Sequence, residues 1–529
     1  MLLFATTPFL LPLLSTLPNA HAALYYPTPA LSFFEHILVD NWGAYASNFS
    51  SAITPCTNYV SQTGTTGLNS GRTTAAQWMR VMFHDFITAN VSAGTGGIDA
   101  SIGFETAREE NKGSAFNDSF SFWKPFVGEG ISMADLVALG TVMSNNLCGG
   151  AQMPFQAGRV DATEAGKTTG VPAPETDLEE TLLFFERAGF DKVAAVGLTA
   201  CGHSLGSVHH GGFPEAVDES FVTPNNTNGG SNFDTTRGVF DPNVLGEYLN
   251  GTGNKGGPLV NSYNDTMNSD KRLYESDKNA TMHTLFAQGV GFLDTCAELM
   301  GRAINTVPAG VQLSESITVM PVKPFNTTFD FGQDGKLTLS GKIRILTPAD
   351  SSPPRSLTLR INHHETELVP EAEMGSSVFG RSGGEYGTTT YFPFSLSEYA
   401  IQNATSFSVQ VPSALEQTFR IDSQAFFVPS LTSMSGTALN VTLSDCQKRS
   451  CEDLTILISA PITQRGTLAP KMSEMNVVLS EAKQERRVCT LCEGHIVLPD
   501  VPTGLVTIEA FMEGKLVDTL LVNGGQAGW

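Results

Sequence analysis

The stretch MRVMFHDF, residues 79–86, places an arginine, a phenylalanine and a histidine at positions 80, 83 and 84. On an α-helix, side chains three and four residues apart share one face, so this spacing brings the three together. Burying both Arg80 and His84 on one helix face costs free energy, which indicates that these groups have a function there. In isolation the pattern is more often a core histidine paired with a carboxylate, so the interpretation depends on the rest of the chain.

A second segment, VAAVGLTACGHSLGSVHH at residues 193–210, places a histidine in an apolar helix among small side chains. The small residues beside His203 are Ala200, Gly202, Ser204 and Gly206. They allow a large flat group to approach the helix, and a haem with His203 as its axial ligand fits that description. We therefore expect a haem between this helix and the arginine–histidine face.

A haem in this position gives each residue a chemical role. Nε2 of His203 would bind the iron, and a buried carboxylate on Nδ1–H would strengthen that ligand. On the opposite side, neutral His84 would take a proton from hydrogen peroxide and return it to the oxygen that leaves as water. Arg80 would stabilise the charge that develops as the O–O bond breaks, and Phe83 would keep the pocket dry and narrow.

Residues 30–305 resemble the plant, fungal and bacterial haem peroxidase superfamily, and most of all its secreted fungal members. The segments that carry the resemblance occur in the family's order: Arg80 to Asp85, Gly97 to Ser101, Glu110-Asn111, Gly158 to Asp161, Val171 to Pro174 and Leu198 to His209. The resemblance implies a mainly α haem-peroxidase fold that binds haem b. It also implies a peroxidase that uses hydrogen peroxide, through a ferryl intermediate, to oxidise small organic donors of the phenolic type. Arg80, His84 and Phe83 take the catalytic positions, and Asn111 orients the distal histidine.

Two calcium sites are expected as well. Hard oxygen donors around a Gly-rich loop suit Ca²⁺. The distal set is Asp85, Asp99, Ser101 and the carbonyl of Gly97. The proximal set is Asp234, Thr236, Asp241 and the carbonyl of Val239, completed by Ser204 as in the fungal enzymes that the chain resembles. Any one of these residues alone is equally well explained as a turn cap, but as a set they favour calcium.

The carboxylate behind the axial histidine is expected in KRLYESDKNAT, residues 271–281. This segment resembles the fungal pattern that ends in a buried aspartate, which makes Asp277 the predicted partner of His203. Glu275, two residues away, is the alternative.

The segment pattern also departs from known subtypes. Positions that carry manganese-binding acids in relatives are here Thr73, Gln77 and His209, so a manganese site is not favoured. Leu198 stands where lignin-oxidising relatives have a surface tryptophan. No tryptophan lies near the proximal position of cytochrome c peroxidases, where Phe213 or Phe221 is expected to stack instead.

Hydrophobic periodicity divides the chain into two parts. Residues 28–49, 73–91, 131–147, 176–188, 192–207 and 280–305 read as helices. Residues 336–346, 356–364, 406–412, 440–445, 454–461 and 504–522 alternate between apolar and polar, with hairpin signals at Asp334-Gly335 and Glu513-Gly514. We therefore expect a haem peroxidase domain over residues 23–315, followed by an all-β, antiparallel sandwich-like domain over residues 316–529.

The role of the predicted β domain is open. It could bind a cell-wall polysaccharide or another protein, or serve only to stabilise the helical part. Candidates for a sugar site are the aromatic residues Tyr391, Phe392, Phe394, Phe426 and Phe427, although core filling is favoured for most of them. The alternative to an enzyme is thus a secreted, non-catalytic binding protein on a peroxidase scaffold, with the β domain as its binding module.

The N-terminus and the sequons predict a secreted, extracellular glycoprotein. Residues 1–22 combine an apolar run with an Ala-His-Ala ending and predict a signal peptide. The Asn-x-Ser/Thr sequons are Asn48, Asn90, Asn117, Asn225, Asn250, Asn264, Asn279, Asn326, Asn403 and Asn440. A net charge of −22 argues against nucleic acid and against an anionic membrane surface, and no later apolar run is long enough to span a membrane.

The eight cysteines are expected to form disulfides in an oxidising compartment. Four lie before residue 300 and four after residue 440, which suggests two separately bridged parts. We expect Cys56 to pair with Cys148 and Cys201 with Cys296, although four cysteines allow three pairings. The alternative for the C-terminal four, Cys446, Cys451, Cys489 and Cys492, is a zinc site.

Overall fold

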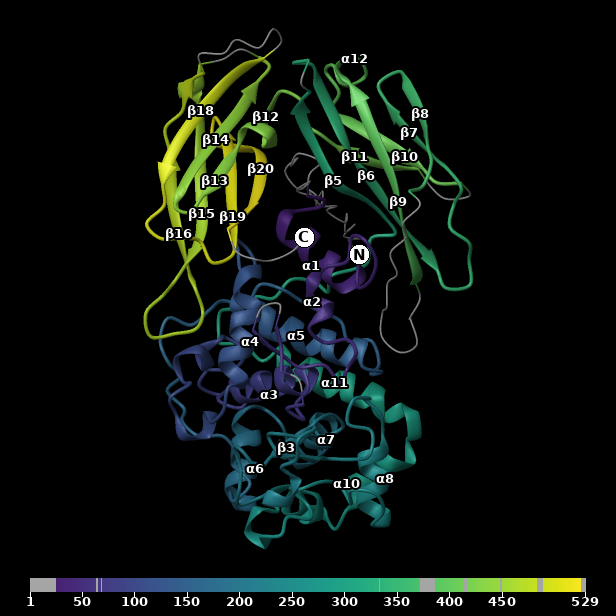
Figure 1. Cartoon of the computed structure of the whole chain (residues 1–529), viewed down its shortest axis with the longest axis vertical. Coiled ribbons are helices and arrows are strands. Elements are labelled where there is room, and N and C mark those ends of the chain that lie inside the picture. Colours follow the sequence, from purple (N-terminus) through teal and green to yellow (C-terminus); the bar gives the residue numbers. More distant parts are fainter. Residues whose placement is uncertain are drawn as a thin grey trace, which may run out of the picture.

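The computed structural model describes residues 25–524 except 63, 64, 68, 333, 372–385, 413–415, 448, 449 and 483–488. The predicted signal peptide lies outside the described residues. The chain forms a helical half, followed from residue 322 by a β half (Figure 1). Among the described residues, no helix has the length and apolar character needed to cross a membrane.

The helical half contains eleven described α-helices. They are α1 (Pro29–Val39), α2 (Asn48–Ser51), α3 (Thr74–Phe86), α4 (Ala115–Trp123), α5 (Met133–Leu147), α6 (Leu178–Arg187), α7 (Lys192–Gly202), α8 (Asn243–Asn250), α9 (Ser269–Tyr274), α10 (Ala280–Ala287) and α11 (Phe292–Ile304). Two short antiparallel pairs accompany them: β1 (Val60–Gln62) with β2 (Thr65–Thr66), and β3 (Ser207–His209) with β4 (Gly230–Asn232). Each predicted helical segment contains a helix, but the segment 280–305 is two helices and the segment 28–49 breaks after Val39.

Side-chain caps and one glycine position the helices around the site. Ser132 and Asp191 accept hydrogen bonds from the first-turn N–H groups of α5 and α7, which fixes where these helices begin. In α5, a Cβ on Gly140 would lie 2.8 Å from Trp123 and 3.2 Å from Trp78. Glycine therefore lets α5 pack closely against α3, which carries Trp78 and the predicted distal residues.

The β half forms two sandwiches, where the sequence predicted one. The first packs the sheet β5-β6-β9 on the sheet β11-β10-β7-β8, and the second packs β12-β14-β18-β17, with β13 beside β14, on β16-β15-β19-β20. Strands of the first are β5 (Val322–Phe331), β6 (Leu337–Pro348), β7 (Leu357–Ile361), β8 (His364–Leu368), β9 (Tyr386–Ser397), β10 (Ser406–Gln410) and β11 (Gln417–Arg420). Strands of the second are β12 (Ala425–Phe427), β13 (Ser433–Ser435), β14 (Ala438–Asp445), β15 (Leu454–Ile462), β16 (Lys471–Val477), β17 (Ser480–Glu481), β18 (Thr490–Val497), β19 (Leu505–Met512) and β20 (Lys515–Asn523).

The aromatic residues suggested for a sugar site belong to the interior. Tyr391, Phe392, Phe394, Phe426 and Phe427 are each at most 6% exposed. Core filling is therefore their role, and they form no sugar site on the surface.

Two disulfides lie within each half of the chain, and none of these four joins one half to the other. Cys56–Cys148 and Cys201–Cys296 form as predicted, and the second of these joins α7 to α11. Cys446–Cys489 and Cys451–Cys492 bridge the second sandwich, so the alternative of a four-thiolate zinc site is wrong.

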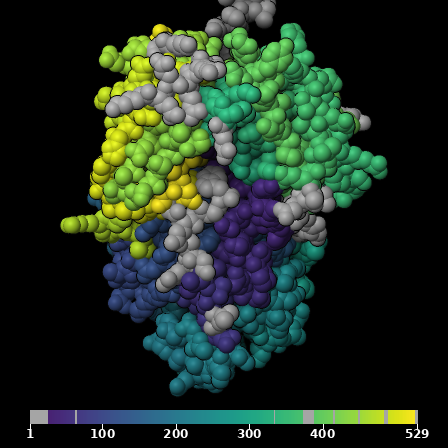
Figure 2. All heavy atoms as spheres, turned by 45° about the horizontal axis from the view of Figure 1, so that its top comes forward, coloured from purple at the N-terminus to yellow at the C-terminus, as the bar shows by residue number. Residues whose placement is uncertain are grey.

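The two halves meet at a seam of buried charge along α1. Arg344 of β6 is fully buried and donates to both carboxylate oxygens of Glu35 and to Asp40, with Nη1 2.8 Å from Asp40 Oδ2. Lys323 Nζ lies 2.8 Å from Glu35 Oε2, and the hydroxyl of Tyr391 donates to Asp40 at 2.9 Å. The N-terminal segment occupies this seam in both overall views (Figures 1 and 2).

The second sandwich and the connecting segment also contact the helical half. Leu505 N–H donates to Val127 O at 2.8 Å, and Leu468 N–H donates to Gly103 O at 3.1 Å. The segment between α11 and β5 connects the two halves, and its Ser314 N–H donates to Ala157 O at 2.8 Å. The β half therefore packs directly on the helical half.

Candidate active site

The distal side is built on α3. Nδ1–H of His84 donates to Asn111 Oδ1 at 2.8 Å, and the Asn111 amide donates to Glu105 O at 3.0 Å, which fixes the orientation of the asparagine. In the neutral ring Nε2 is then the unprotonated nitrogen, and among the described residues it has no hydrogen-bond partner. Burial, aided by the neighbouring charge of Arg80, lowers the pKa of His84 to about 3. His84 is therefore a neutral imidazole at pH 7 that can accept a proton.

Arg80 lies one helical turn before His84. Its guanidinium sits 5.1 Å from the centre of the Phe116 ring, and Nη2 donates to Lys112 O at 3.2 Å. In the part of the chain that the structure describes, no carboxylate lies within ion-pair distance of Arg80. Burial lowers the pKa of Arg80 to about 10, so the side chain keeps its positive charge at neutral pH. Phe83 is half-buried, and its ring lies 5.9 Å from that of Phe185.

The proximal histidine follows α7 and is held by two contacts. Nδ1–H of His203 donates to Asp270 Oδ2 at 2.5 Å, and Asp270 is buried at the start of α9. The ring of Phe233 stacks on the His203 ring at 4.0 Å with an angle of 9° between the planes. Neither Phe213 nor Phe221 takes this position, so both expectations for the stacking residue were wrong.

The predicted partner of His203 also requires correction. Asp277 accepts from the N–H and hydroxyl of Thr281, at the start of α10, and Glu275 is exposed. Asp270 takes the place assigned to Asp277. A signal for it exists in the sequence, because Asp270, Leu273 and Tyr274 have the spacing of one buried face of a short helix.

The residues present fit a haem. His84 and His203 each hold Nδ1 in a hydrogen bond, and among the described residues neither Nε2 has a partner. A Cβ built on Gly202 would meet nothing within 4 Å, which leaves room beside His203. Gly206 has another role, because a Cβ there would lie 2.4 Å from Ala76 of α3.

The predicted distal calcium residues come together after α3. Asp85 is buried and accepts from the N–H groups of Asp99 and Ala100, at 3.1 and 2.8 Å. Burial and the charge of Asp99 raise the pKa of Asp85 well above its usual value. The Ser101 hydroxyl is buried without a partner, and a Cβ on Gly97 would lie 2.4 Å from Thr306 O. Two carboxylates and a free hydroxyl therefore meet at this loop.

The predicted proximal calcium residues lie in the loop after β4. Asp234 Oδ1 accepts from the N–H and hydroxyl of Thr236, at 2.8 and 3.1 Å, while its Oδ2 is buried without a partner. Burial raises the pKa of Asp234 to about 7, and the charge of Asp241 adds to this. Ser204 donates to Ala200 O at 3.1 Å, and Val239 is exposed. No group of three or more His, Cys, Asp or Glu side chains in the described part of the chain is spaced for a metal. A calcium ion at either loop would therefore rely on hydroxyl and carbonyl oxygens.

The positions compared with a manganese site lie in a positively charged environment. Gln77 accepts from Arg72 and donates to Ser119, both at 2.9 Å. Burial, with the positive charges of Arg72, Arg80 and Arg237, lowers the pKa of His209 to about 4. This environment disfavours a divalent cation.

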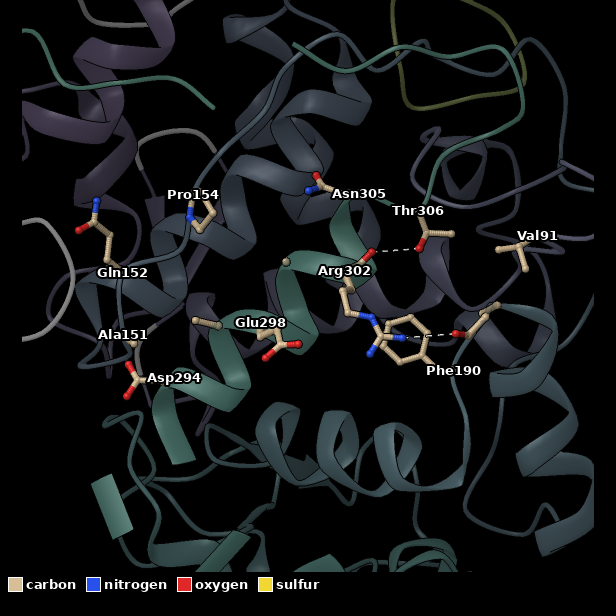
Figure 3. A pocket seen from close by; sticks show the side chains of 14 residues that line it. Val91, Ala151, Gln152, Pro154, Phe190, Asp294, Glu298, Arg302, Asn305 and Thr306 are labelled. Atoms are coloured by element: carbon tan, nitrogen blue, oxygen red, sulfur yellow. Dashed lines mark hydrogen bonds between the residues drawn. The ribbon is translucent and has the colours of Figure 1, made fainter. Parts of the chain in front are cut away.

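A cavity away from these residues lies against α11 (Figure 3). Its volume is about 860 Å³, and its walls include Asp294, Glu298 and Arg302 of α11 together with Phe190. None of the predicted site residues lines it. The disulfide Cys201–Cys296 connects α11, which lines this groove, to α7, the helix that precedes the proximal histidine.

Comparison with known proteins shows which proteins the helical half is similar to. Residues 60–289 match the family model described as peroxidase. The chain is 34% identical over 351 residues to a WSC domain-containing protein of Arthroderma benhamiae, covering 65% of this chain and 45% of that protein. It is 31% identical to ligninase H2 of Phanerodontia chrysosporium (34% of this chain, 47% of that protein). It is 33% identical to the peroxisomal L-ascorbate peroxidase 5 of Arabidopsis thaliana (27% and 51%). The chain thus spans about half the length of these relatives. Residues 60–289 are therefore a peroxidase domain, and the relatives are consistent with the plant, fungal and bacterial peroxidase superfamily.

Proposed function

We propose that this protein is a secreted haem peroxidase that uses hydrogen peroxide to oxidise small organic reductants. The observation that carries the proposal is the pair of imidazoles, His84 and His203, each with Nδ1 in a hydrogen bond. Among the described residues, neither Nε2 has a partner and the cation of Arg80, beside His84, has no carboxylate within ion-pair distance. Bound haem would supply the iron that takes up peroxide and holds the two oxidising equivalents. The remaining chemistry belongs to the side chains.

On the distal side the proposal assigns proton transfer to His84. Its Nε2 accepts a proton from one peroxide oxygen and gives it to the other, which leaves as water. Asn111 keeps Nδ1 protonated and the ring oriented, so Nε2 stays the basic atom. Arg80 stabilises the negative charge that develops during cleavage. Phe83 and Phe116 limit the access of water.

On the proximal side His203 would bind the iron through Nε2. The carboxylate of Asp270 accepts the Nδ1 proton at 2.5 Å and so raises the electron-donating strength of the ring. Phe233 fixes the plane of the imidazole by stacking. We also propose a Ca²⁺ ion at each of the two loops, where a cation would offset the buried carboxylates of Asp85 and Asp234.

The four disulfides support an extracellular location, because such bridges persist in oxidising compartments. The alternative of a non-catalytic binding protein has weaker support, because the aromatic residues once considered for a sugar site are buried. A binding role of the β half toward a polysaccharide or protein remains compatible with catalysis in the helical half.

The direct test is the substitution His84→Leu. The variant should keep its haem, held by His203, and lose the reaction with peroxide by a factor of about 10² to 10⁴, the usual contribution of a general base. His363→Leu is the matched control, because His363 is exposed in the β half. Unchanged peroxide reactivity in His84→Leu would refute the role of His84.

A further inference from the structure

A second cavity lies beside the candidate active site, between β1, β2 and the loops that carry Asn225 and Arg237. Its volume is about 190 Å³, and its walls are largely polar. Among the described residues that line it, Arg72 and Arg237 are the only charged ones, and three asparagines add amide groups. The lining therefore offers donors and positive charge without any carboxylate.

The guanidinium of Arg237 donates fewer hydrogen bonds than that of Arg72. Its Nη1 donates to Gly71 O at 3.3 Å, and no carboxylate in the described part of the chain lies within ion-pair distance. A guanidinium has five N–H donors, so most of its hydrogen-bonding capacity remains available. Half-buried cations are normally paired, which makes this one a candidate for a ligand.

Arg72 supplies a fixed second charge. It donates to Ser114 at 2.7 Å and to Gln77 at 2.9 Å, and its guanidinium lies 4.5 Å from the centre of the Tyr59 ring. Its ion pair with Asp118 is long, at 3.8 Å. The side chain is therefore held in place while its charge is only partly compensated.

The cavity is connected to the candidate active site through His209. Gly71 O, in the cavity wall, lies 3.3 Å from His209 Nε2. The charges of Arg72, Arg237 and the distal Arg80 contribute, after burial, to the lowered pKa of His209. The two arginines give the cavity a positive potential that attracts a negatively charged molecule.

We propose that this cavity binds the carboxylate group of a small anionic aromatic reductant. A carboxylate is planar and matches the guanidinium fork, and its charge complements a lining that contains two arginines and no acid. The inference deepens the proposed function by naming the class of donor. That the bound molecule is an aromatic reductant rests on the proposed function, whereas binding of the anion does not require turnover.

The test compares two probes of nearly equal shape, 4-hydroxybenzoate and the uncharged 4-hydroxybenzamide, by calorimetric titration of the full-length protein without peroxide. The acid should bind at least about tenfold more tightly than the amide, with an affinity that falls as salt is added. Arg237→Gln should weaken binding of the acid about tenfold and leave the amide unaffected, and Arg237→Lys should retain only part of the affinity because it keeps the charge but loses the planar fork. Arg302→Gln is the control, because Arg302 lines the separate groove behind α11.

Steady-state kinetics add a second readout. In Arg237→Gln the KM for the acid should rise about tenfold while kcat and both constants for the amide stay unchanged. Equal binding of the two probes, or an Arg237→Gln variant that binds the acid normally, would overturn the proposal. A variant that loses its haem would overturn it too, because Arg237 would then hold a carboxylate of the haem. If neither probe is oxidised although the acid binds through Arg237, the proposed function fails and the binding site stands.

Discussion

At the scale of single residues, the hydrogen bond between His203 and Asp270 decides how strongly the proximal side would donate to iron. Asp270→Asn keeps the shape of the contact but removes the negative charge. We expect the reaction with peroxide to slow about 10- to 100-fold, the usual effect of losing such a partner of a metal ligand. Stopped-flow absorption measures this rate.

Asp277→Asn is the matched control for that experiment. Asp277 accepts from the N–H and hydroxyl of Thr281 at the start of α10 and does not contact His203, so its loss should leave the peroxide reaction unchanged. A variant of Asp277 as slow as Asp270→Asn would restore the original prediction from the sequence.

His84 gives a pH dependence whose direction follows from its environment. Burial and Arg80 lower the pKa of His84 to about 3, below the usual value near 6.5. The base is therefore neutral and active from neutral pH down to about pH 4, and the rate of reaction with peroxide should fall as the pH drops through about 3. Stopped-flow rates between pH 3 and 8 measure the profile, and a midpoint near 6.5 would show that burial does not control this residue.

The predicted site residues that the structure brings together and the neighbours of His203 that the sequence missed differ in how local their pattern is. Arg80, Phe83 and His84 share one helix, so their spacing alone brings them together. Asp270 and Phe233 reach His203 from segments that are 67 and 30 residues away, and three acids lie within eight residues of one another there. Only the fold of α9 decides which of them turns inward.

At the scale of elements, the packing of α5 on α3 depends on a glycine. A Cβ on Gly140 would lie 2.8 Å from Trp123, and both tryptophans there are fully buried. Gly140→Val should therefore cost about 1–3 kcal/mol of unfolding free energy through overpacking. Gly301→Ala in α11 is the control, because its Cβ would meet nothing within 4 Å and alanine favours the helix. Denaturant unfolding should show a lower free energy of unfolding for Gly140→Val and no decrease for Gly301→Ala.

The strands illustrate what periodicity determines and what it leaves open. Alternation located β6, β7, β10, β14, β15, β19 and β20 but missed strands such as β5, β9, β16 and β18. The Glu513-Gly514 turn joins β19 to β20 with positive φ at both residues, as a tight hairpin requires. Which strands share a sheet depends on contacts between distant segments, such as β14 with β18. For that reason the sequence indicated one sandwich where two cores form.

At the scale of the whole molecule, the buried charges along α1 hold the first sandwich to the helical half. Arg344→Met leaves Glu35 and Asp40 buried without their shared cation, and should cost about 3–5 kcal/mol of unfolding free energy. Arg360→Met is the control, because its pairs with Glu365 and Glu416 are exposed, and no measurable change is expected. Denaturant unfolding of the full chain measures both.

The same seam predicts the direction of acid sensitivity. The cations beside Glu35 and Asp40, chiefly Arg344, lower the pKa of both carboxyl groups below the values that they have in the unfolded chain. Their contribution to stability is therefore present above about pH 4 and lost as the pH falls below it. Arg344→Met should remove this part of the acid dependence, and an unchanged acid transition would mean that the seam contributes little.

The central claim is that the helical half holds a haem that reacts with peroxide. The most direct measurement is the absorption spectrum of the purified protein before and after one equivalent of hydrogen peroxide. We predict a Soret band that shifts and weakens when peroxide is added and recovers when a phenolic donor follows. A protein that shows no Soret band, even after it is supplied with haem, would contradict the proposal and direct attention to what the β half binds.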